Sequence, residues 1–154
     1  MDLRTRFTAE TKTSMLAGNA ARTSTLRMIV AKMKDSDIAA RSSSPPGPPL
    51  DDAALVAMLR GMAKSRRESV DMYRQGNRPE LAAKEEAEIA VIEAFLPQQM
   101  DDAAMTAAIQ AAITATSAAN IKDMGRVMAA LRSEHAATLD MAKAGPMVKA
   151  ALGG

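Results

Sequence analysis

The chain has 154 residues, a net charge of +2 and no cysteine, which leaves room for one ordinary domain or two small helical ones. The lack of cysteine excludes disulfides, thiolate zinc sites and a cysteine nucleophile. Hydrophobic residues make up 47% of the chain but aromatic residues only 2%, so Leu, Ile, Val, Ala and the 13 methionines must form the core. Because Ala, Leu and Met favour helices and β-branched runs are scarce, we predict an all-α protein.

Positive charge is concentrated near the N-terminus. Residues 1–41 contain eight Lys/Arg and four Asp/Glu, a net charge of +4, whereas residues 101–154 contain five of each. Attraction for phosphate is therefore expected mainly in the first helices. The N-terminal residues lack the apolar core of a signal peptide, and no apolar run approaches about 20 residues. We expect a cytoplasmic protein without a membrane partner.

Two helices are predicted before residue 42. The first is expected to end near Gly18-Asn19, and Thr23 or Ser24 is a candidate N-cap of the second. The residues expected to face inward are Leu3, Phe7, Met15 and Leu16 in the first helix and Leu26, Ile29, Val30, Met33 and Ile38 in the second.

Residues 42–50, "SSSPPGPPL", interrupt the helical pattern. Four prolines and one glycine remove amide donors and exclude a helix or a central strand. A stiff, extended spacer is the simpler interpretation, and a ligand for a proline-binding partner is the alternative.

The next two helices are predicted to form an antiparallel hairpin. Asp51 or Asp52 caps the third helix, Gly76 ends it as the C′ residue, Pro79 opens the fourth and Pro97 ends it. The inward residues are predicted to be Leu55, Met58, Leu59, Met62, Ser69, Met72 and Tyr73 in the third helix and Leu81, Ile89, Ile92, Phe95 and Leu96 in the fourth.

Three short helices are predicted after residue 97, as a three-helix bundle. Asp101-Asp102 caps the fifth helix, Asn120 the sixth, and Asp140 or Pro146 opens the seventh. The inward residues are predicted to be Met105, Ile109 and Ile113, then Met124, Val127, Met128 and Leu131, then Met147, Val148 and Leu152. The predicted domains are residues 1–96, with the proline-rich segment inside, and residues 97–154.

No catalytic motif is present in the sequence. His135 is the only histidine, which excludes histidine metal pairs, and we find no glycine-rich phosphate loop or nucleophile elbow. We therefore expect no catalytic residue, no metal and no cofactor. The methionines at helical spacing are interpreted as core filler, with a partner groove as the alternative.

Charged side chains cluster in the predicted hairpin. Glu85 and Glu88 are placed to meet Arg66, Arg67 or Arg74 of the preceding helix, with a solvated face as the alternative. The basic residues around Tyr73 also resemble a strip that can follow a phosphate backbone. Because acids interrupt this strip, a salt-bridged helix is the favoured interpretation.

The stretch "NIKDMGRVMAAL", residues 120–131, places a glycine within a predicted helix. Gly125 costs about 1 kcal/mol relative to alanine in an exposed helix, so we expect something to approach its backbone. One candidate is a neighbouring helix of the bundle. The other is a phosphate-sugar backbone flanked by Lys122 and Arg126, which lie one turn apart.

Several stretches together resemble the YqeY-like family. They are "STLRMIVAKMKDSDIAAR", "RRESVDMYRQGNRPELAAKEEAEIAVIEAFLPQQM", "IKDMGRVMAALRSEH" and "DMAKAGPMVKAAL". The C-terminal part of that family is similar to the tail domain of the aspartyl/glutamyl-tRNA amidotransferase. The resemblance implies an N-terminal helical domain followed by a C-terminal three-helix domain.

The resemblance also implies tRNA as a partner, with an aminoacyl-tRNA synthetase or an amidotransferase as further candidates. Carried onto matching positions, it indicates Lys122, Gly125, Arg126, Lys143 and Lys149 as tRNA-binding residues. A secondary basic surface is predicted from Arg22, Arg27, Lys32, Lys34, Arg66 and Arg67. Because the catalytic portions of the amidotransferase are absent from this sequence, carbon-nitrogen ligase chemistry is implied by kinship only.

We therefore predict a non-catalytic tRNA-binding accessory module. The alternative is an adaptor that docks on a translation enzyme through a methionine-rich helical face.

Overall fold

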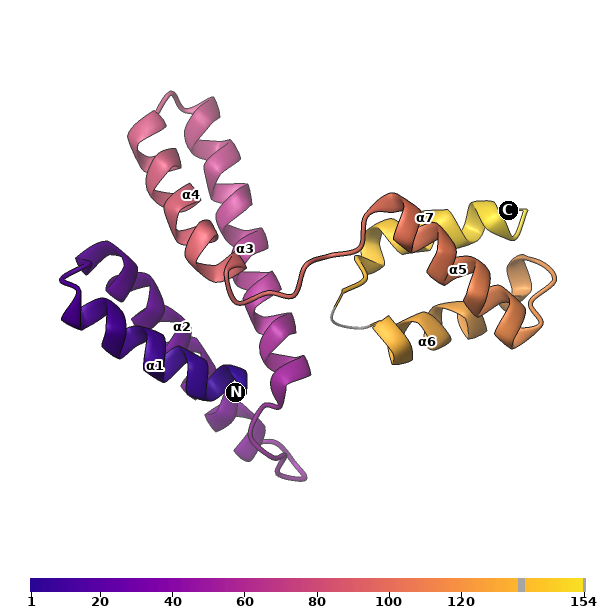
Figure 1. Ribbon diagram of the computed structural model, residues 1–154, viewed down its shortest axis with the longest axis horizontal. Coiled ribbons are helices and arrows are strands. Elements are labelled where there is room, and N and C mark those ends of the chain that lie inside the picture. Colours follow the sequence, from indigo (N-terminus) through magenta and orange to yellow (C-terminus); the bar gives the residue numbers. More distant parts are fainter. Residues whose placement is uncertain (136–137, 154) are drawn as a thin grey trace. The chain divides into compact units, whose positions relative to one another are not determined.

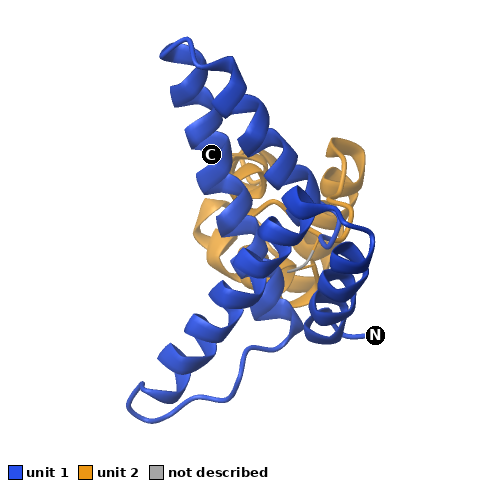
Figure 2. Ribbon diagram, turned by 90° about the vertical axis from the view of Figure 1, so that its left-hand side faces the viewer, with its two compact units in different colours: residues 1–96 blue, residues 97–154 orange. Residues whose placement is uncertain are grey.

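The computed structural model describes residues 1–135 and 138–153, and every regular element within these ranges is a helix. The predicted all-α class is confirmed. The chain divides into two compact units, Met1–Leu96 (unit 1) and Pro97–Gly154 (unit 2) (Figure 1 and Figure 2). Unit 1 contains α1 (Leu3–Leu16), α2 (Ala20–Arg41), α3 (Asp52–Gln75) and α4 (Pro79–Glu93). Unit 2 contains α5 (Asp102–Thr116), a 3₁₀ turn η1 (Ile121–Asp123), α6 (Met124–His135) and α7 (Met141–Ala151).

Short polar side chains start most of these helices. The side chains of Asp51, Asp101 and Asp140 accept hydrogen bonds from the first-turn amides of α3, α5 and α7, as the sequence predicts. Pro146 lies inside α7 and does not open it. The predicted cap of α2 is wrong, because Asn19 accepts from the Arg22 amide and so starts the helix one turn earlier.

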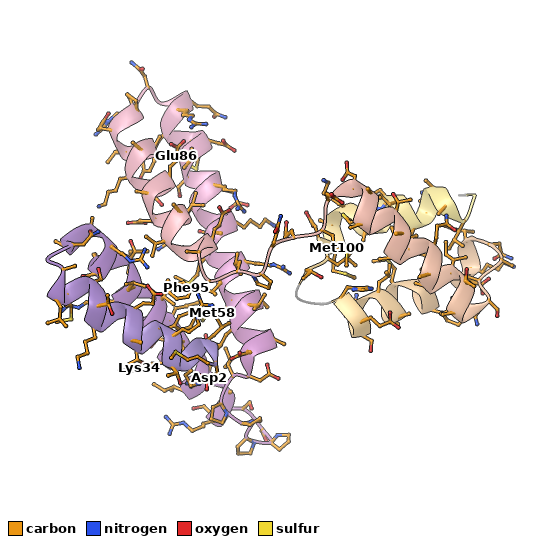
Figure 3. All side chains as sticks on the ribbon, viewed as in Figure 1. Asp2, Lys34, Met58, Glu86, Phe95 and Met100 are labelled. Carbon is orange, nitrogen blue, oxygen red and sulfur yellow. The ribbon has the colours of Figure 1, made fainter. Side chains whose placement is uncertain are left out.

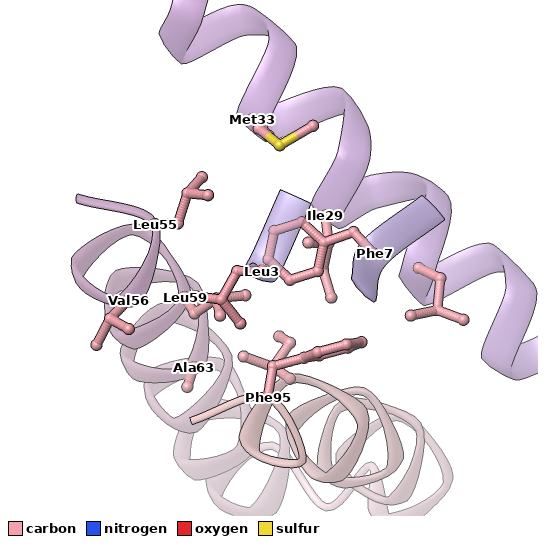
Figure 4. Packing of buried hydrophobic residues seen from close by; sticks show 11 residues of the cluster. Leu3, Phe7, Ile29, Met33, Leu55, Val56, Leu59, Ala63 and Phe95 are labelled. Atoms are coloured by element: carbon pink, nitrogen blue, oxygen red, sulfur yellow. The ribbon is translucent and has the colours of Figure 1, made fainter. Parts of the chain in front are cut away.

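The core of unit 1 is formed by residues from all four helical segments (Figure 4). The rings of Phe7 and Phe95 meet edge to face, with centroids 5.0 Å apart and an interplanar angle of 84°. The buried members of this cluster are Leu3, Phe7, Leu26, Ile29, Met33, Leu55, Val56, Leu59, Ala63, Ile92 and Phe95.

Four apolar residues predicted to face inward are exposed: Met15 (53%), Leu16 (81%), Ile38 (51%) and Met72 (71%). In α1 the inward position is taken by Ser14, which is buried and accepts a hydrogen bond from Thr23 Oγ1 at 2.9 Å. Each residue of a helix turns the side chain by about 100°, so Leu16 faces away from Ser14. Met72 is displaced in the same way from buried Val70.

Helices α3 and α4 run antiparallel and are tied by three ion pairs (Figure 3). Arg66 Nε lies 3.0 Å from Glu88 Oε2, and both side chains are only 15% exposed. The other pairs are Arg67 with Glu93 and Arg74 with Glu86. The salt-bridged interpretation of this basic strip therefore describes the structure.

The turn between α3 and α4 departs from the prediction at Gly76. Gly76 has φ −82°, and the left-handed position is taken by Asn77, with φ 56°. Asparagine tolerates this conformation better than other residues with a β-carbon. Pro79 opens α4 at its first turn, as predicted.

The proline-rich segment 42–50 contains neither helix nor strand and is anchored at both ends. The Gly47 amide donates to the Ala40 carbonyl at 2.8 Å, and the Leu50 amide donates to Asp37 Oδ1 at 2.9 Å. A β-carbon at Gly47 would lie 3.4 Å from that same carbonyl oxygen, which explains a small residue there. The segment is thus a spacer held against the C-terminal turns of α2.

Unit 2 is built from three helices whose apolar faces meet in one core. Figure 1 shows α6 running opposite to α5 and α7. Asn120 and Asp123 form a reciprocal capping box that starts η1 and α6. The buried residues are Met105, Ile109, Ala112, Val127, Leu131, Leu139, Ala144, Val148 and Leu152.

Candidate nucleic-acid interface

Lys122, Gly125 and Arg126 lie together at the start of α6, and all three are exposed. Arg126 donates to Asp123 Oδ1 at 2.6 Å and to the Thr116 carbonyl at 3.1 Å, while its side chain stays 59% exposed. These two bonds fix the direction of the guanidinium. Since guanidinium has five N–H donors, others remain for an incoming acceptor.

Asp123 is the acid nearest to this basic pair. Its carboxylate accepts hydrogen bonds from the Ala119 amide, Arg126 and the Asn120 amide, which lower its pKa from 3.8 to about 2. The negative charge is therefore bound by local donors at neutral pH. Lys122 has no such carboxylate among the ion pairs of the described residues.

Gly125 is not packed against a neighbouring helix of unit 2. A β-carbon built on its backbone meets no heavy atom within 4 Å apart from the helix's own backbone. The bundle-packing explanation for this glycine is therefore wrong. Open space beside the backbone is compatible with the approach of a ligand.

The structure separates the two candidate lysines of α7. Lys143 lies at the start of that helix, where its Nζ is 3.1 Å from Asp102 Oδ1 at the start of α5. Lys149 lies in its last turn. Because α6 runs opposite to α7, the end with Lys149 and the start of α6 point toward the same end of unit 2 (Figure 1).

The predicted secondary basic surface does not act as one set. Arg22, Arg66 and Arg67 form ion pairs with Glu10, Glu88 and Glu93. Arg27, Lys32 and Lys34 are exposed on α2, and Figure 3 labels Lys34. Only these last three present basic charge without an acidic partner among the described ion pairs.

A groove between α1 and α2 was missed by the sequence analysis. It has a volume of about 610 Å³, and Lys12, Arg27 and Lys34 line it together with apolar side chains. Its exposed apolar rim is Met15 and Leu16. The periodic pattern of α1 contains both rim residues but assigns them to the core, because spacing alone does not distinguish a buried stripe from a partly exposed one.

No described helix is both long and apolar enough to span a membrane. Within residues 1–135 and 138–153, no three His, Asp or Glu side chains are grouped so that they could hold a metal ion.

Two known proteins are similar to this chain over part of its length. "Altered inheritance of mitochondria protein 41, mitochondrial" from Eremothecium gossypii is 32% identical over 85 residues, 55% of this chain and 44% of the relative. The protein of the same name from Vanderwaltozyma polyspora is 28% identical over 97 residues, 58% of this chain and 50% of the relative. The chain thus matches about half the length of these relatives. Their names say mitochondrial, so the cytoplasmic location stays a prediction.

The model of one protein family covers nearly all of the chain. The family described as "Yqey-like protein" matches residues 4–152, from the first turn of α1 to the residue that follows α7. This chain therefore belongs to the YqeY-like family.

Proposed function

We propose that the protein is a non-catalytic RNA-binding accessory module that holds tRNA through the start of α6. The observation that supports this most directly is the open space over Gly125, with exposed Lys122 and Arg126 on either side. A phosphate-sugar backbone can approach a helix closely where no side chain intervenes, and flanking cations then contact its phosphates. The similarity of the family's C-terminal part to the amidotransferase tail makes tRNA the preferred RNA.

The site has a small positive excess rather than a broad basic surface. Residues 101–154 carry five Lys/Arg and five Asp/Glu, and Lys143 is paired with Asp102. We therefore assign the contact to Lys122, Arg126 and Lys149, and leave Lys143 outside it. Binding should be weak and should fall steeply with salt, since each phosphate contact releases counterions.

The test is binding of labelled total tRNA and of a single-stranded RNA of equal length, each over a series of salt concentrations. Lys122→Gln/Lys149→Gln should weaken tRNA binding at low salt and reduce the slope of log K against log salt by about 1 for each lysine that contacts phosphate. These substitutions avoid Arg126, whose removal would also break the contacts to Asp123 and Thr116.

Lys143→Gln is the matched control, because it removes one lysine of unit 2 at the opposite end. It should leave the affinity and the salt slope unchanged. Equal binding of tRNA and single-stranded RNA, or equal loss in the double variant and the control, argues against a tRNA site at α6.

An adaptor is the second candidate function. The observation that favours it is the groove between α1 and α2, whose rim exposes Met15 and Leu16 to solvent. Adaptor binding would survive salt concentrations that release RNA. The names of the two relatives refer to inheritance of mitochondria and identify no ligand, so neither candidate rests on them.

A further inference from the structure

The groove between α1 and α2 is an apolar hollow with exposed side chains along its rim. Val30, Ala31 and Met33 of α2 line it, while Met15 and Leu16 of α1 are 53% and 81% exposed. An adjacent hollow of about 590 Å³ shares Met15, Arg27 and Ala31 with it, so the depression continues along α2. Methionine side chains are flexible and adapt to the shape of a partner.

The charges around this groove have one sign. Lys12 lies on the α1 wall, and Arg27 and Lys34 lie on the α2 wall. Among its lining residues, all of them in the described part of the chain, none is acidic. Glu10 and Asp37, the acids of α1 and α2 with described partners, are engaged by Arg22 and Arg4.

We propose that this groove binds one amphipathic helix of a partner protein, with apolar anchors in the hollow and acidic residues along both edges. A helix laid between two helices presents anchors at i, i+3 or i+4, and i+7, and its flanking positions face the groove walls. Acids at those flanks would meet Lys12 on one side and Arg27 or Lys34 on the other. This names the surface and the partner chemistry of the adaptor candidate and does not depend on RNA binding by unit 2.

The geometry favours a helix over the other anionic partners. Single-stranded nucleic acid needs aromatic side chains on which bases stack, and none of the chain's three aromatic residues, Phe7, Tyr73 and Phe95, lines the groove. A membrane surface needs apolar side chains that protrude together, whereas Val30, Ala31 and Met33 line a hollow. The apolar floor between two basic walls matches the cross-section of an acidic amphipathic helix.

The test uses the full chain and three labelled peptides of about 18 residues, roughly five helical turns: an amphipathic helix with leucine anchors and glutamate flanks, the same helix with lysine flanks, and a scrambled acidic peptide. Only the first should bind. Lys12→Glu/Lys34→Glu should weaken that binding about tenfold or more, because two attractive pairs become repulsive. Lys64→Glu/Lys84→Glu, with the same charge change on α3 and α4, should leave it unchanged.

Two further measurements separate loss of the site from loss of the fold. The Lys12→Glu/Lys34→Glu variant should gain affinity for the lysine-flanked peptide, which a misfolded variant would not do. In protein labelled at its methionine methyl groups, the acidic peptide should shift the signals of Met15, Met28 and Met33 and leave that of Met105 in place, since Met105 is buried in unit 2.

Three results would overturn the proposal. Equal affinity for the acidic and lysine-flanked peptides would remove the charge argument. Anionic vesicles that bind through Lys12 and Lys34 and displace the peptide would make the groove a lipid-binding surface. RNA binding that is lost in Lys12→Glu/Lys34→Glu but kept in Lys122→Gln/Lys149→Gln would make it a nucleic-acid surface and would also move the RNA site away from α6.

Discussion

Arg4 of α1 and Asp37 of α2 form a two-point ion pair that also holds the proline-rich segment. Arg4 Nη1 and Nη2 lie 2.7 and 2.9 Å from the two carboxylate oxygens of Asp37. The same carboxylate accepts from the Leu50 amide, and Arg4 Nη2 donates to the Leu50 carbonyl, each at 2.9 Å. Two side chains thus satisfy both backbone groups of the residue that ends the segment before α3.

The first prediction concerns this contact. Asp37→Ala removes the acceptor of the Leu50 amide and the partner of Arg4, so the amide of Leu50 should exchange with solvent much faster than in the wild type. Hydrogen exchange followed by NMR measures this directly. Glu80→Ala is the control, because it removes the exposed ion pair with Arg78 in the α3–α4 turn and should leave Leu50 unchanged. An unchanged Leu50 rate in Asp37→Ala would mean that the segment is held by other contacts.

The second prediction concerns acid. Hydrogen bonds from Arg4 and from the Leu50 amide lower the pKa of Asp37 to about 2, from an ordinary 3.8. A carboxyl group with a lower pKa in the folded state stabilises the protein above its unfolded pKa, and this contribution is lost as pH falls from about 4 to about 2. Urea midpoints of the wild type should therefore fall over this pH range more steeply than those of Asp37→Asn.

Arg4→Met provides the matching variant for this pH experiment, because it removes the first cause of the shift and keeps the carboxyl group. It should flatten the same part of the pH profile. If both variants keep the wild-type slope, the acid sensitivity arises elsewhere, for example at Asp123, whose pKa is also about 2.

The third prediction uses two exposed helical glycines, Gly61 of α3 and Gly125 of α6. A β-carbon at either position meets no heavy atom within 4 Å. Gly61→Ala should stabilise the protein by about 0.5–1 kcal/mol in urea denaturation, and Gly125→Ala by less, because it lies near the start of its helix. Only Gly125→Ala should weaken tRNA binding. Loss of binding in both variants, or in neither, would remove the role assigned to Gly125.

The fourth prediction concerns the turn between α3 and α4. Because Asn77 has φ 56°, Asn77→Val should cost about 1–2 kcal/mol, whereas Asn77→Gly should cost nothing. Gly76→Ala should have little effect, since Gly76 has a negative φ and the added β-carbon lies 3.4 Å from the Met72 carbonyl oxygen. Urea denaturation of the three variants gives the ranking, and a larger cost for Gly76→Ala than for Asn77→Val would contradict it.

Much of the fold was predictable from local chemistry. Helical class followed from composition, and the starts of α3, α4, α5 and α7 followed from Asp51, Pro79, Asp101 and Asp140. These signals act within one turn of the chain, through hydrogen bonds to free first-turn amides or through the fixed φ of proline. The aliphatic stripes of α5 and α6 were predictable for the same reason, since their spacing is set by the helix itself.

The candidate sites depended on partners far apart in the sequence. Periodicity placed Met15 and Leu16 inward, and only the packing of α2 against α1 shows that Ser14 takes the buried position and leaves them on a groove. Likewise, composition counted Arg22, Arg66 and Arg67 as basic surface, and only the fold brings Glu10, Glu88 and Glu93 to them.

The sequence by itself determined where most helices form, because capping and propensity act over a few residues. The tertiary structure alone decided which apolar residues are exposed, which cations keep their charge available and whether Gly125 faces a helix or open space. These properties depend on segments up to tens of residues apart, and no local pattern specifies which of them will meet.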